Sequence, residues 1–447
     1  MTRRLFLGAT ASAAATFAQT RRNKPNVVVI VADDLGYGEI GVQGTEVPTP
    51  NIDALAKGGV RFTNGYVSCP VCSPTRAGLM TGRYQQRFGH ELNPGPAQNS
   101  DPNFGLPLDQ TTLANRMTSL GYATGMVGKW HLGYQPQYHP MKRGFDEFFG
   151  FLGGAHSYID SRADKANPIY RGTTPVEEPE YLTDAFMREA ARFIDSKANQ
   201  PFFLYLTFNA VHNPLQGAKY LDRFKNVTDE KRRHFSAMLS ALDDGVGRVV
   251  TALRNSRLEE NTLIVFISDN GGPTPATTAG NGPLHGFKGQ VYEGGIRVPY
   301  IMQWKGRIPA GKTYDKPVIS LDILPTAVAA AGGPAPTGID GVDLLPFLTG
   351  KNSGTPHDEL HWRFGPQWAV RKGDWKLLKT AQGSVELYDL KSDIGEKKDL
   401  AASAAPKLKE LQASHDAWNA QLIPPKWKTE RQAAPGPERK ALRKKKQ

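Results

Sequence analysis

The sequence is poor in cysteine and has no long apolar segment. Two cysteines, Cys69 and Cys72, among 447 residues are too few for a disulfide framework. No stretch approaches the ~20 consecutive apolar residues of a membrane-spanning helix, and we find no internal repeat. These absences exclude a disulfide-stabilised scaffold and a repeat protein, and we expect no membrane span.

What remains is a chain long enough to bury a large core. Hydrophobic residues make up 39% of it, and no long low-complexity tract interrupts the sequence. Chains of this length commonly form more than one domain, because a single hydrophobic core stops growing as the chain lengthens. We therefore predict one large domain accompanied by a smaller one.

The formal net charge of +12 is concentrated at the two ends of the chain. Residues 425–447 hold nine Lys or Arg against two Glu, which accounts for seven of the twelve excess positive charges. Arg3, Arg4, Arg21 and Arg22 lie at the other end. Because the rest is near neutral, the charge does not indicate a nucleic-acid partner. Residues 425–447 are predicted to be a solvated, disordered basic tail.

Residues 1–22 have the composition of an export signal. Arg3 and Arg4 precede a short, weakly apolar run, and small residues near Ala18 are suitable for cleavage. The run is too short to span a membrane. We expect a twin-arginine-like signal and hence an exported protein, either periplasmic or secreted. The alternative is a frayed basic terminus.

The stretch from residue 68 to 83 concentrates unusual chemistry around Cys72. Its sequence is S-C-P-V-C-S-P-T-R-A-G-L-M-T-G-R, in which Pro74 and Thr75 predict the start of a helix. Cys72 would then lie at a helix N-terminus, where free N–H groups favour an anion, and Arg76 would lean back towards it. Two alternatives are a Cys-x-x-Cys redox pair formed with Cys69 and a simple pair of buried cysteines.

Four apolar runs each end abruptly in polar side chains, and they begin near residues 26, 122, 201 and 262. Such runs are typical of strands buried on both faces of a parallel sheet. Because the carboxyl ends of parallel strands lie along one edge, the polar residues are predicted to converge there. They are Asp33 and Asp34 after the first run, Lys129 and His131 after the second, His212 after the third, and Asp269 and Asn270 after the fourth.

Three carboxylates and one amide in this set provide only oxygen ligands. They belong to Asp33, Asp34, Asp269 and Asn270. Oxygen ligands are preferred by hard divalent cations such as Ca²⁺ and Mg²⁺, and the lack of His or Cys among the four disfavours zinc. The sequence therefore predicts a hard-cation site at the sheet edge.

Several motifs resemble those of the type I, formylglycine-dependent sulfatases, including the arylsulfatases and N-acetylgalactosamine sulfatases. Cys72, Pro74 and Arg76, followed by A-G-L-M-T-G, match the family's Cys-x-Pro-x-Arg signature. Residues 128–133, G-K-W-H-L-G, match its Gly-Lys-Trp-His-x-Gly motif, and the glycine-rich residues 282–298 match another. The resemblance covers roughly residues 25–420. It departs at Glu39, where the family more often has Asp.

The resemblance implies a fold, a modification and a cofactor. The fold would be α/β, with an alkaline-phosphatase-like large domain whose mostly parallel sheet lies between helices, and a small C-terminal α+β domain with an antiparallel sheet. A maturation enzyme would convert Cys72 to formylglycine, whose hydrated aldehyde is the nucleophile. The cation would be Ca²⁺ rather than Mg²⁺.

The resemblance also implies roles for individual residues. His131 would be the base that releases sulfate from the nucleophile, and His212, with Lys288, would protonate the departing alcohol. The expected catalytic residues are Cys72, Arg76, Lys129, His131, His212 and Lys288. The expected metal ligands are Asp33, Asp34, Cys72, Asp269 and Asn270. The expected substrate contacts are Lys129, His156, His212 and Lys288, with Ser157 a further candidate.

Periodicity and turn residues predict the remaining organisation. We expect a catalytic domain over 23–340 and a small domain over 341–424, joined through the Gly- and Pro-rich residues 332–341. A helix is predicted to begin after Thr49, its cap. Further helices are predicted at 108–120, 183–197, 231–254 and 406–422, and short C-terminal strands at 361–363, 368–371, 375–378 and 385–389.

The predicted function is hydrolysis of a sulfate ester, with a sulfated saccharide as substrate and attack at a chain end. Residues 158–180 lack periodicity and are expected to form a loop at the pocket rim, where specificity often lies. Trp130 and His156, with Trp362 or Trp368 from the small domain, are expected at the mouth of the site. The alternatives are a phosphodiester or phosphonate ester hydrolase, and a non-catalytic glycan-binding relative. The sequence gives no indication of the oligomeric state.

Overall fold

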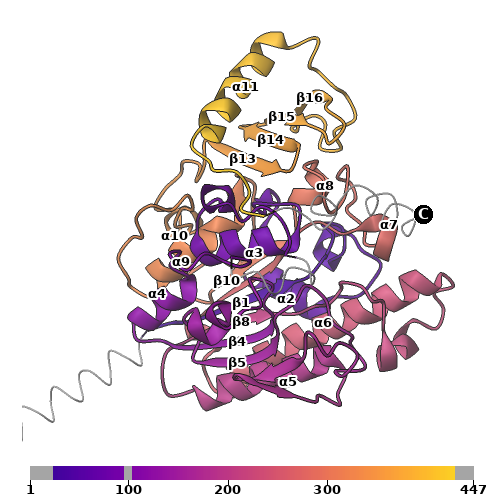
Figure 1. Cartoon of the computed structure of the whole chain (residues 1–447), viewed down its shortest axis with the longest axis vertical. Helices are drawn as coiled ribbons and strands as arrows, with labels where there is room; N and C mark the ends of the chain where they lie inside the picture. Colours follow the sequence, from indigo (N-terminus) through magenta and orange to yellow (C-terminus); the bar gives the residue numbers. More distant parts are fainter. Residues whose placement is uncertain (1–23, 95–102, 428–447) are drawn as a thin grey trace, which may run out of the picture.

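The computed structural model describes residues 24–94 and 103–427 (Figure 1). The predicted export signal, residues 1–22, and most of the predicted basic tail lie outside the described residues. A ten-stranded mixed sheet and a four-stranded antiparallel sheet organise the rest, and β3 (Gly65–Tyr66) pairs separately with β12 (Val318–Ile319). None of the described helices combines the length and the apolar character needed to cross a membrane.

The centre of the large sheet is parallel, which confirms the predicted fold class. Its central strands are β1 (Asn26–Ala32), β4 (Ala123–Lys129), β5 (Glu147–Phe151), β8 (Phe202–Thr207) and β9 (Thr262–Ser268). They lie side by side in the order β9-β1-β8-β4-β5, and each neighbouring pair is parallel. The four strands predicted from apolar runs are therefore adjacent, with their carboxyl ends at one edge.

Shorter strands extend both sides of this parallel centre. One side continues as β10, β2 and β11, in which β10 is antiparallel to β9, and the other as β6 and β7, in which β6 is antiparallel to β5. Antiparallel strands at the edges of a parallel sheet are common in large α/β domains. The bounds are β2 (Val60–Phe62), β6 (Ile169–Arg171), β7 (Thr174–Val176), β10 (Tyr300–Gln303) and β11 (Lys312–Tyr314).

Strand β1 illustrates why the apolar runs form the middle of the sheet. Successive side chains of a strand point to opposite faces. Val27, Val29 and Val31 pack into the core on one face, whereas Val28 and Ile30 pack into the core on the other. Every residue of β1 is buried, so a continuous apolar run is required rather than an alternating one.

Helices cover both faces of the sheet (Figure 1). Residues of α2, α5 and α6 belong to one core, and residues of α3, α4 and α9 belong to the other. The bounds are α2 (Pro50–Lys57), α3 (Cys72–Thr81), α4 (Leu113–Ser119), α5 (Leu182–Ser196), α6 (Glu230–Asn255) and α9 (Ile323–Ala330), with the short helices α7 (Thr274–Thr277), α8 (Glu293–Ile296) and α10 (Leu345–Leu348).

The start of α2 corrects one prediction. Thr49 precedes the helix, but its side chain makes no capping hydrogen bond. Instead, the Asp243 carboxylate on α6 accepts hydrogen bonds from the backbone N–H groups of Asn51 and Ile52, at 3.1 and 2.8 Å. A carboxylate from a neighbouring helix thus caps α2, which sequence proximity does not reveal.

Two other expectations were wrong in detail. The helix predicted over 108–120 is restricted to α4, because Thr112 and Asn115 form a capping box that starts the helix there. Residues 158–180 are not wholly irregular. They contain β6 and β7, which pair as an antiparallel hairpin and extend the large sheet.

The C-terminal region forms the predicted antiparallel sheet with one helix. Its strands are β13 (Glu359–Phe364), β14 (Gln367–Lys372), β15 (Trp375–Lys379) and β16 (Val385–Asp389), and the helix is α11 (Ala405–Asn419). Val370, Leu377, Leu387 and Leu411 form a small core between the sheet and α11. Figure 1 shows this unit at one end of the long axis of the molecule. The boundary predicted at residue 340 lies between α9 and α10.

Candidate active site

The polar residues at the four strand ends meet beside the N-terminus of α3. Asp33 and Asp34 follow β1, Asp269 and Asn270 follow β9, and all four are buried. The backbone joins these ends, because Asp269 N donates to Ala32 O at 3.1 Å and Asp34 N donates to the Asp269 carboxylate at 3.2 Å. Parallel pairing of β1 with β9 therefore brings together two acidic segments that are 235 residues apart.

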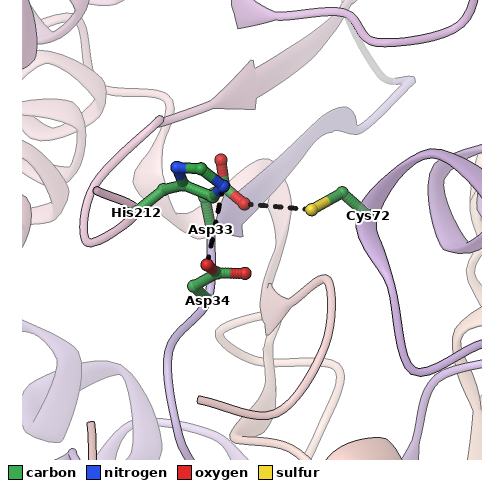
Figure 2. Close-up of side chains that lie close together, drawn as sticks. All are labelled: Asp33, Asp34, Cys72 and His212. Atoms are coloured by element: carbon green, nitrogen blue, oxygen red, sulfur yellow. Dashed lines mark hydrogen bonds and ion pairs between the residues drawn. The ribbon is translucent and has the colours of Figure 1, made fainter. Parts of the chain in front are cut away.

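Cys72 is the first residue of α3 and faces this acidic group (Figure 2). Its Sγ lies 3.6 Å from Asp33 Oδ1 and 3.2 Å from Lys288 Nζ. Burial raises the pKa of the Cys72 thiol to about 12, although Lys129 and Lys288 act in the opposite direction. An unmodified thiol here stays protonated at neutral pH and is a poor nucleophile.

The alternative of a redox pair finds no support in this geometry. Cys69 and Cys72 are both free and both buried. Burial raises the pKa of Cys69 as well. Redox-active Cys-x-x-Cys motifs depend on a thiol with a lowered pKa, so these two thiols have the opposite character.

Each of the three carboxylates has a cationic partner, and of these partners Lys129 and Arg76 are fully buried and Lys288 is partly exposed. Lys129 Nζ lies 2.6 Å from Asp33 Oδ2, and Lys288 Nζ lies 2.5 Å from Asp34 Oδ1. Arg76 donates through Nε and Nη2 to Asp269 Oδ2, at 2.9 and 2.7 Å. Such pairing offsets the high desolvation cost of buried charges. The hydrogen bonds of Arg76 thus go to Asp269 and to the backbone of Lys129, not to Cys72 as the sequence suggested.

The carboxylates respond to this environment in opposite ways. Burial opposes the ionisation of Asp33, but Lys129 and His212 hold its pKa well below the ordinary value. Burial and the nearby charge of Asp33 raise the pKa of Asp269. Repulsion between close carboxylates is relieved when a cation binds between them.

The residues present fit a hard cation. Ligand atoms of Asp33, Asp34, Cys72 and His212 lie within 4.8 Å of one another (Figure 2). The Asn270 side chain adds a second observation: its Nδ2 donates to Asp34 Oδ1 at 2.8 Å, while its buried Oδ1 has no partner among the described residues. A buried acceptor without a partner is costly, and a bound cation would satisfy it.

Two histidines lie near the nucleophile. His131 follows β4 with φ at 58°, and its Nδ1 has no hydrogen-bond partner within the described chain. His212 follows β8, donates through Nδ1 to Asn213 O at 2.6 Å, and has its Nε2 3.7 Å from Asp34. Burial lowers the pKa of both imidazoles. Both are therefore neutral at pH 7 and able to accept a proton.

A cavity of about 350 Å³ opens onto these groups. Cys72, His131 and His212 line its inner part, and the other lining residues come from irregular loops. Asp164, Ala166 and Asn167 lie within residues 158–180, the segment predicted to form the pocket rim. Asn93 and Tyr134 also line the cavity, and no periodicity or motif in the sequence marked them.

Other predicted residues are not at the cavity. His156 does not line it; the His156 ring packs 5.2 Å from that of Phe151, and its Nδ1 contacts Ser157 O at 2.8 Å. Ser157 Oγ donates to Gln216 at 3.3 Å, away from the nucleophile. The expectation that His156 and Ser157 contact the substrate, and that His156 lies at the mouth of the site, has no geometric support.

The predicted tryptophans are structural. Trp130 is fully buried, and its Nε1 donates to Tyr138 O at 2.8 Å. Trp362 is fully buried at the contact between the two sheets, and its Nε1 donates to Val67 O at 2.7 Å. Trp368 stacks 4.1 Å from His415 on α11. All three pack within the protein, so the prediction that they form a sugar-binding rim was wrong.

Family profiles match most of the chain. A profile described as "Sulfatase" matches residues 25–333, and one described as "N-sulphoglucosamine sulphohydrolase, C-terminal" matches residues 285–417. Together they include every residue named above at the strand ends, on α3 and in the C-terminal sheet.

Individual relatives agree with these profiles. The chain is 36% identical over 377 residues to the N-acetylgalactosamine-6-sulfatase of Sus scrofa, covering 79% of this chain and 71% of the relative. It is 35% identical over 451 residues to human (Homo sapiens) arylsulfatase A, covering 87% of each. A solved structure described as Ps i-CgsB in complex with k-i-k-neocarrahexaose superposes with a TM-score of 0.86 at 38% identity, covering 91% of this chain and 95% of that one.

Proposed function

This chain belongs to the sulfatase family, and from that premise we propose that it hydrolyses a carbohydrate sulfate ester with a formylglycine nucleophile made from Cys72. The observation that carries the proposal is the environment of Cys72. Its side chain lies at a helix N-terminus, 3.2 Å from Lys288 Nζ and 3.6 Å from Asp33 Oδ1, among the side chains that could hold a metal ion. An oxygen nucleophile made from Cys72 would lie where the lysine and the candidate cation ligands meet.

Formylglycine supplies a hydrated aldehyde whose hydroxyl attacks sulfur. The residues of this chain hold the reacting groups and move the protons. Lys129 and Lys288, paired with Asp33 and Asp34, are placed to neutralise sulfate oxygens beside the nucleophile. With substrate bound, Lys288 and the protonated form of His212 supply the proton to the departing alcohol oxygen, and neutral His131 accepts one from the nucleophile when sulfate is released. Both imidazoles border the cavity with Cys72.

Asp33, Asp34, Asp269 and Asn270 would hold the cation, together with the nucleophile's oxygen. The cation would neutralise charge that develops on the sulfuryl group. The unpartnered Asn270 Oδ1 and the oxygen-rich ligand set support a hard cation, and the family resemblance favours Ca²⁺ over Mg²⁺. His212 also lies within this group of ligand atoms. We assign His212 to proton transfer, because hard cations prefer oxygen ligands.

The substrate is proposed to be a sulfated saccharide attacked at a chain end. A relative named for N-acetylgalactosamine-6-sulfate chemistry and a neighbour solved with k-i-k-neocarrahexaose support a carbohydrate. The cavity of about 350 Å³ is at the small end of ligand pockets. A single terminal residue fits such a cavity more easily than the interior of a polymer.

Purified protein tests this proposal when it is produced with and without a formylglycine-generating maturation enzyme. Peptide mass spectrometry should find the aldehyde at Cys72 only in the co-expressed sample, and only that sample should release sulfate. Cys72→Ala should be inactive. Cys69→Ala is the matched control, because this second buried cysteine of the same loop should leave turnover within about threefold of wild type. Full activity with an unmodified thiol would overturn the mechanism.

A substrate panel separates the remaining alternatives. Sulfated mono- and disaccharides should be turned over faster than the intact polymer, an aryl sulfate or a phosphodiester. Preference for the polymer would remove the chain-end proposal, and preference for the phosphodiester would identify a phosphodiesterase of the same superfamily. Binding of the saccharides without turnover by formylglycine-containing protein would indicate a non-catalytic relative.

We further propose that the protein is exported through a twin-arginine-like signal. The paired Arg3 and Arg4 and the following small residues support this. Replacing both arginines by lysine should retain the protein in the cytoplasm in a cell-fractionation assay. Unchanged export would disprove the twin-arginine route.

A further inference from the structure

A buried chain of hydrogen bonds runs beside the nucleophile and has no part in the chemistry proposed above. Ser73, the residue after Cys72, has its Oγ 2.7 Å from His90 Nε2 and 2.6 Å from the backbone oxygen of His131. Ser73 and His90 are both fully buried. The chain thus connects the loop after α3 to the residue proposed as the base.

Hydrogen-bond chemistry fixes the direction of this chain. The carbonyl oxygen of His131 can only accept, so the single hydroxyl proton of Ser73 must be donated to it. Ser73 Oγ must then accept from His90, which requires the tautomer with a proton on Nε2. Burial lowers the pKa of His90 to about 3, against a contact with the Gly105 backbone that raises it, so this imidazole is neutral.

His131 depends on its backbone for its position. Its φ of 58° lies in the left-handed region, which non-glycine residues seldom adopt unless their surroundings impose it. Within the described chain its Nδ1 has no partner. Two hydrogen bonds hold its backbone: His131 N donates to Leu152 O at 3.1 Å, and its carbonyl accepts from Ser73. Losing the second hydrogen bond would let the imidazole rotate.

Lys426 and Trp427, near the C-terminal end of the described chain, pack against His90 and its loop. The Trp427 ring meets the His90 ring edge to face at 4.7 Å, and its Nε1 donates to Leu92 O at 3.1 Å. Lys426 N donates to Gly89 O at 2.9 Å. Gly89 has φ at 73°, and a Cβ there would lie only 2.8 Å from the Lys426 side chain. The segment therefore closes against the loop that carries His90.

We propose that His90 is a positioning residue for sulfate ester hydrolysis: through the hydroxyl of Ser73 it fixes the backbone of His131 and hence the imidazole in the cavity. The inference rests on the proposed role of His131. A purely structural role for His90 would change stability and leave the turnover of the folded enzyme unaltered.

The test compares His90→Ala with His90→Gln and with His415→Ala. A glutamine amide N–H can replace the Nε2 donor. His415 is the matched control, because it is also a buried histidine packed on tryptophan, with its pKa lowered by burial to about 4, but it lies on α11. Values of kcat and KM are measured on a sulfated disaccharide and divided by the folded, formylglycine-containing fraction.

We expect His90→Ala to lower kcat by roughly 10- to 100-fold, the cost of misplacing a catalytic group by about an ångström, while KM changes less than threefold. His90→Gln should recover most of that loss, and His415→Ala should leave kcat within twofold. Unchanged kcat in His90→Ala, equal losses in His90→Ala and His90→Gln, or an equal loss in His415→Ala would each overturn the inference.

Ser73→Ala provides a second test that holds even where His90→Ala fails to fold. It removes only the hydroxyl, leaves the His90 ring packed on Trp427, and should lower kcat as much as His90→Ala. His90 is proposed to act only through the Ser73 hydroxyl, so His90→Gln should cause no further loss of kcat once that hydroxyl is removed. The double variant of Ser73→Ala with His90→Gln should therefore have the kcat of Ser73→Ala alone. Additive losses would contradict the inference. Absence of sulfate release by wild-type formylglycine enzyme would instead contradict the proposed function.

Discussion

Two of the clusters of buried charge among the described residues differ in their surroundings, and the first borders the cavity of about 350 Å³. The active-site cluster pairs Asp33, Asp34 and Asp269 with Lys129, Lys288 and Arg76. The interdomain cluster lies between α8 and the C-terminal sheet, where Lys376 Nζ is 2.8 Å from both Glu293 and Glu396. Arg297, Arg371 and Tyr66 complete the interdomain cluster.

The clusters differ in whether all of their buried polar atoms have hydrogen-bond partners. In the interdomain cluster every buried side-chain oxygen and nitrogen has a partner, and Glu293 Oε2 alone contacts Tyr66 at 2.6 Å and Arg297 at 3.2 Å. In the active-site cluster Asn270 Oδ1 and the adjacent His131 Nδ1 have none among the described residues. Buried charge by itself therefore does not identify a functional site; unsatisfied atoms beside a cavity do.

The largest expected effect is on turnover. Asp269→Asn keeps the size of the side chain and a partner for Arg76 but removes one negative charge from the active-site cluster, so cation binding and catalysis should both fail. We expect kcat/KM to fall roughly 10³-fold or more, with little loss of folded protein. Steady-state assays and metal analysis check this. Asp243→Asn, which alters a buried carboxylate that caps α2, should reduce stability and leave kcat intact.

The next largest effect is expected on stability, from the interdomain cluster. Lys376→Met leaves two buried carboxylates without their shared cation, which should cost about 3 to 5 kcal/mol of unfolding free energy. Chemical denaturation measures the loss, and turnover of the folded enzyme should stay within about fivefold of wild type. A variant that adds Glu293→Gln and Glu396→Gln to Lys376→Met should recover most of the stability. If Lys376→Met lost activity without losing stability, the interdomain cluster would not be purely structural and the proposed difference between the clusters would be wrong.

The pH dependence of stability should also come from the interdomain cluster. Burial and the neighbouring Glu293 raise the pKa of Glu396 to about 7, against the attraction of Lys376. The folded state then holds a proton that the unfolded state releases near pH 4.5, so the unfolding free energy should fall as pH rises from 4.5 to 7. The fall attributable to Glu396 is about 3 kcal/mol. Glu396→Gln should remove it, and an unchanged slope would refute this assignment.

The smallest effect tests the hydrogen bonds of one phenol. Tyr66→Phe removes the hydroxyl that donates to Glu293 at 2.6 Å and accepts from Arg371, and we expect a loss of about 2 kcal/mol because both partners are charged. Tyr122→Phe removes a buried phenol that donates to the neutral carbonyl of Pro25 at 2.8 Å, and should cost about 1 kcal/mol. Both are measured by denaturation. Equal losses would show that the charge of Glu293 is already fully compensated.

Much of the large sheet and of the candidate site was predictable from residue order. The four apolar runs that lead to Asp33, Lys129, His212 and Asp269 became neighbouring parallel strands, so their polar ends had to meet. Residues whose position does not follow from the ends of parallel strands were predicted poorly. His156 is turned into the packing around Phe151, and Trp130 into the core, because a motif position gives no information on the side that a side chain faces.

The sequence by itself determined the parallel centre of the sheet, a helix starting close to Cys72 and the chemical types that converge on it, because these depend on local periodicity and on short motifs. Only the tertiary structure decided the pairing of Arg76 with Asp269, the link from His90 through Ser73 to His131, and the closed interdomain cluster. Each joins segments with no shared periodicity or motif. Which partners meet depends on how the elements pack against one another, and the local sequence around each residue does not determine that packing.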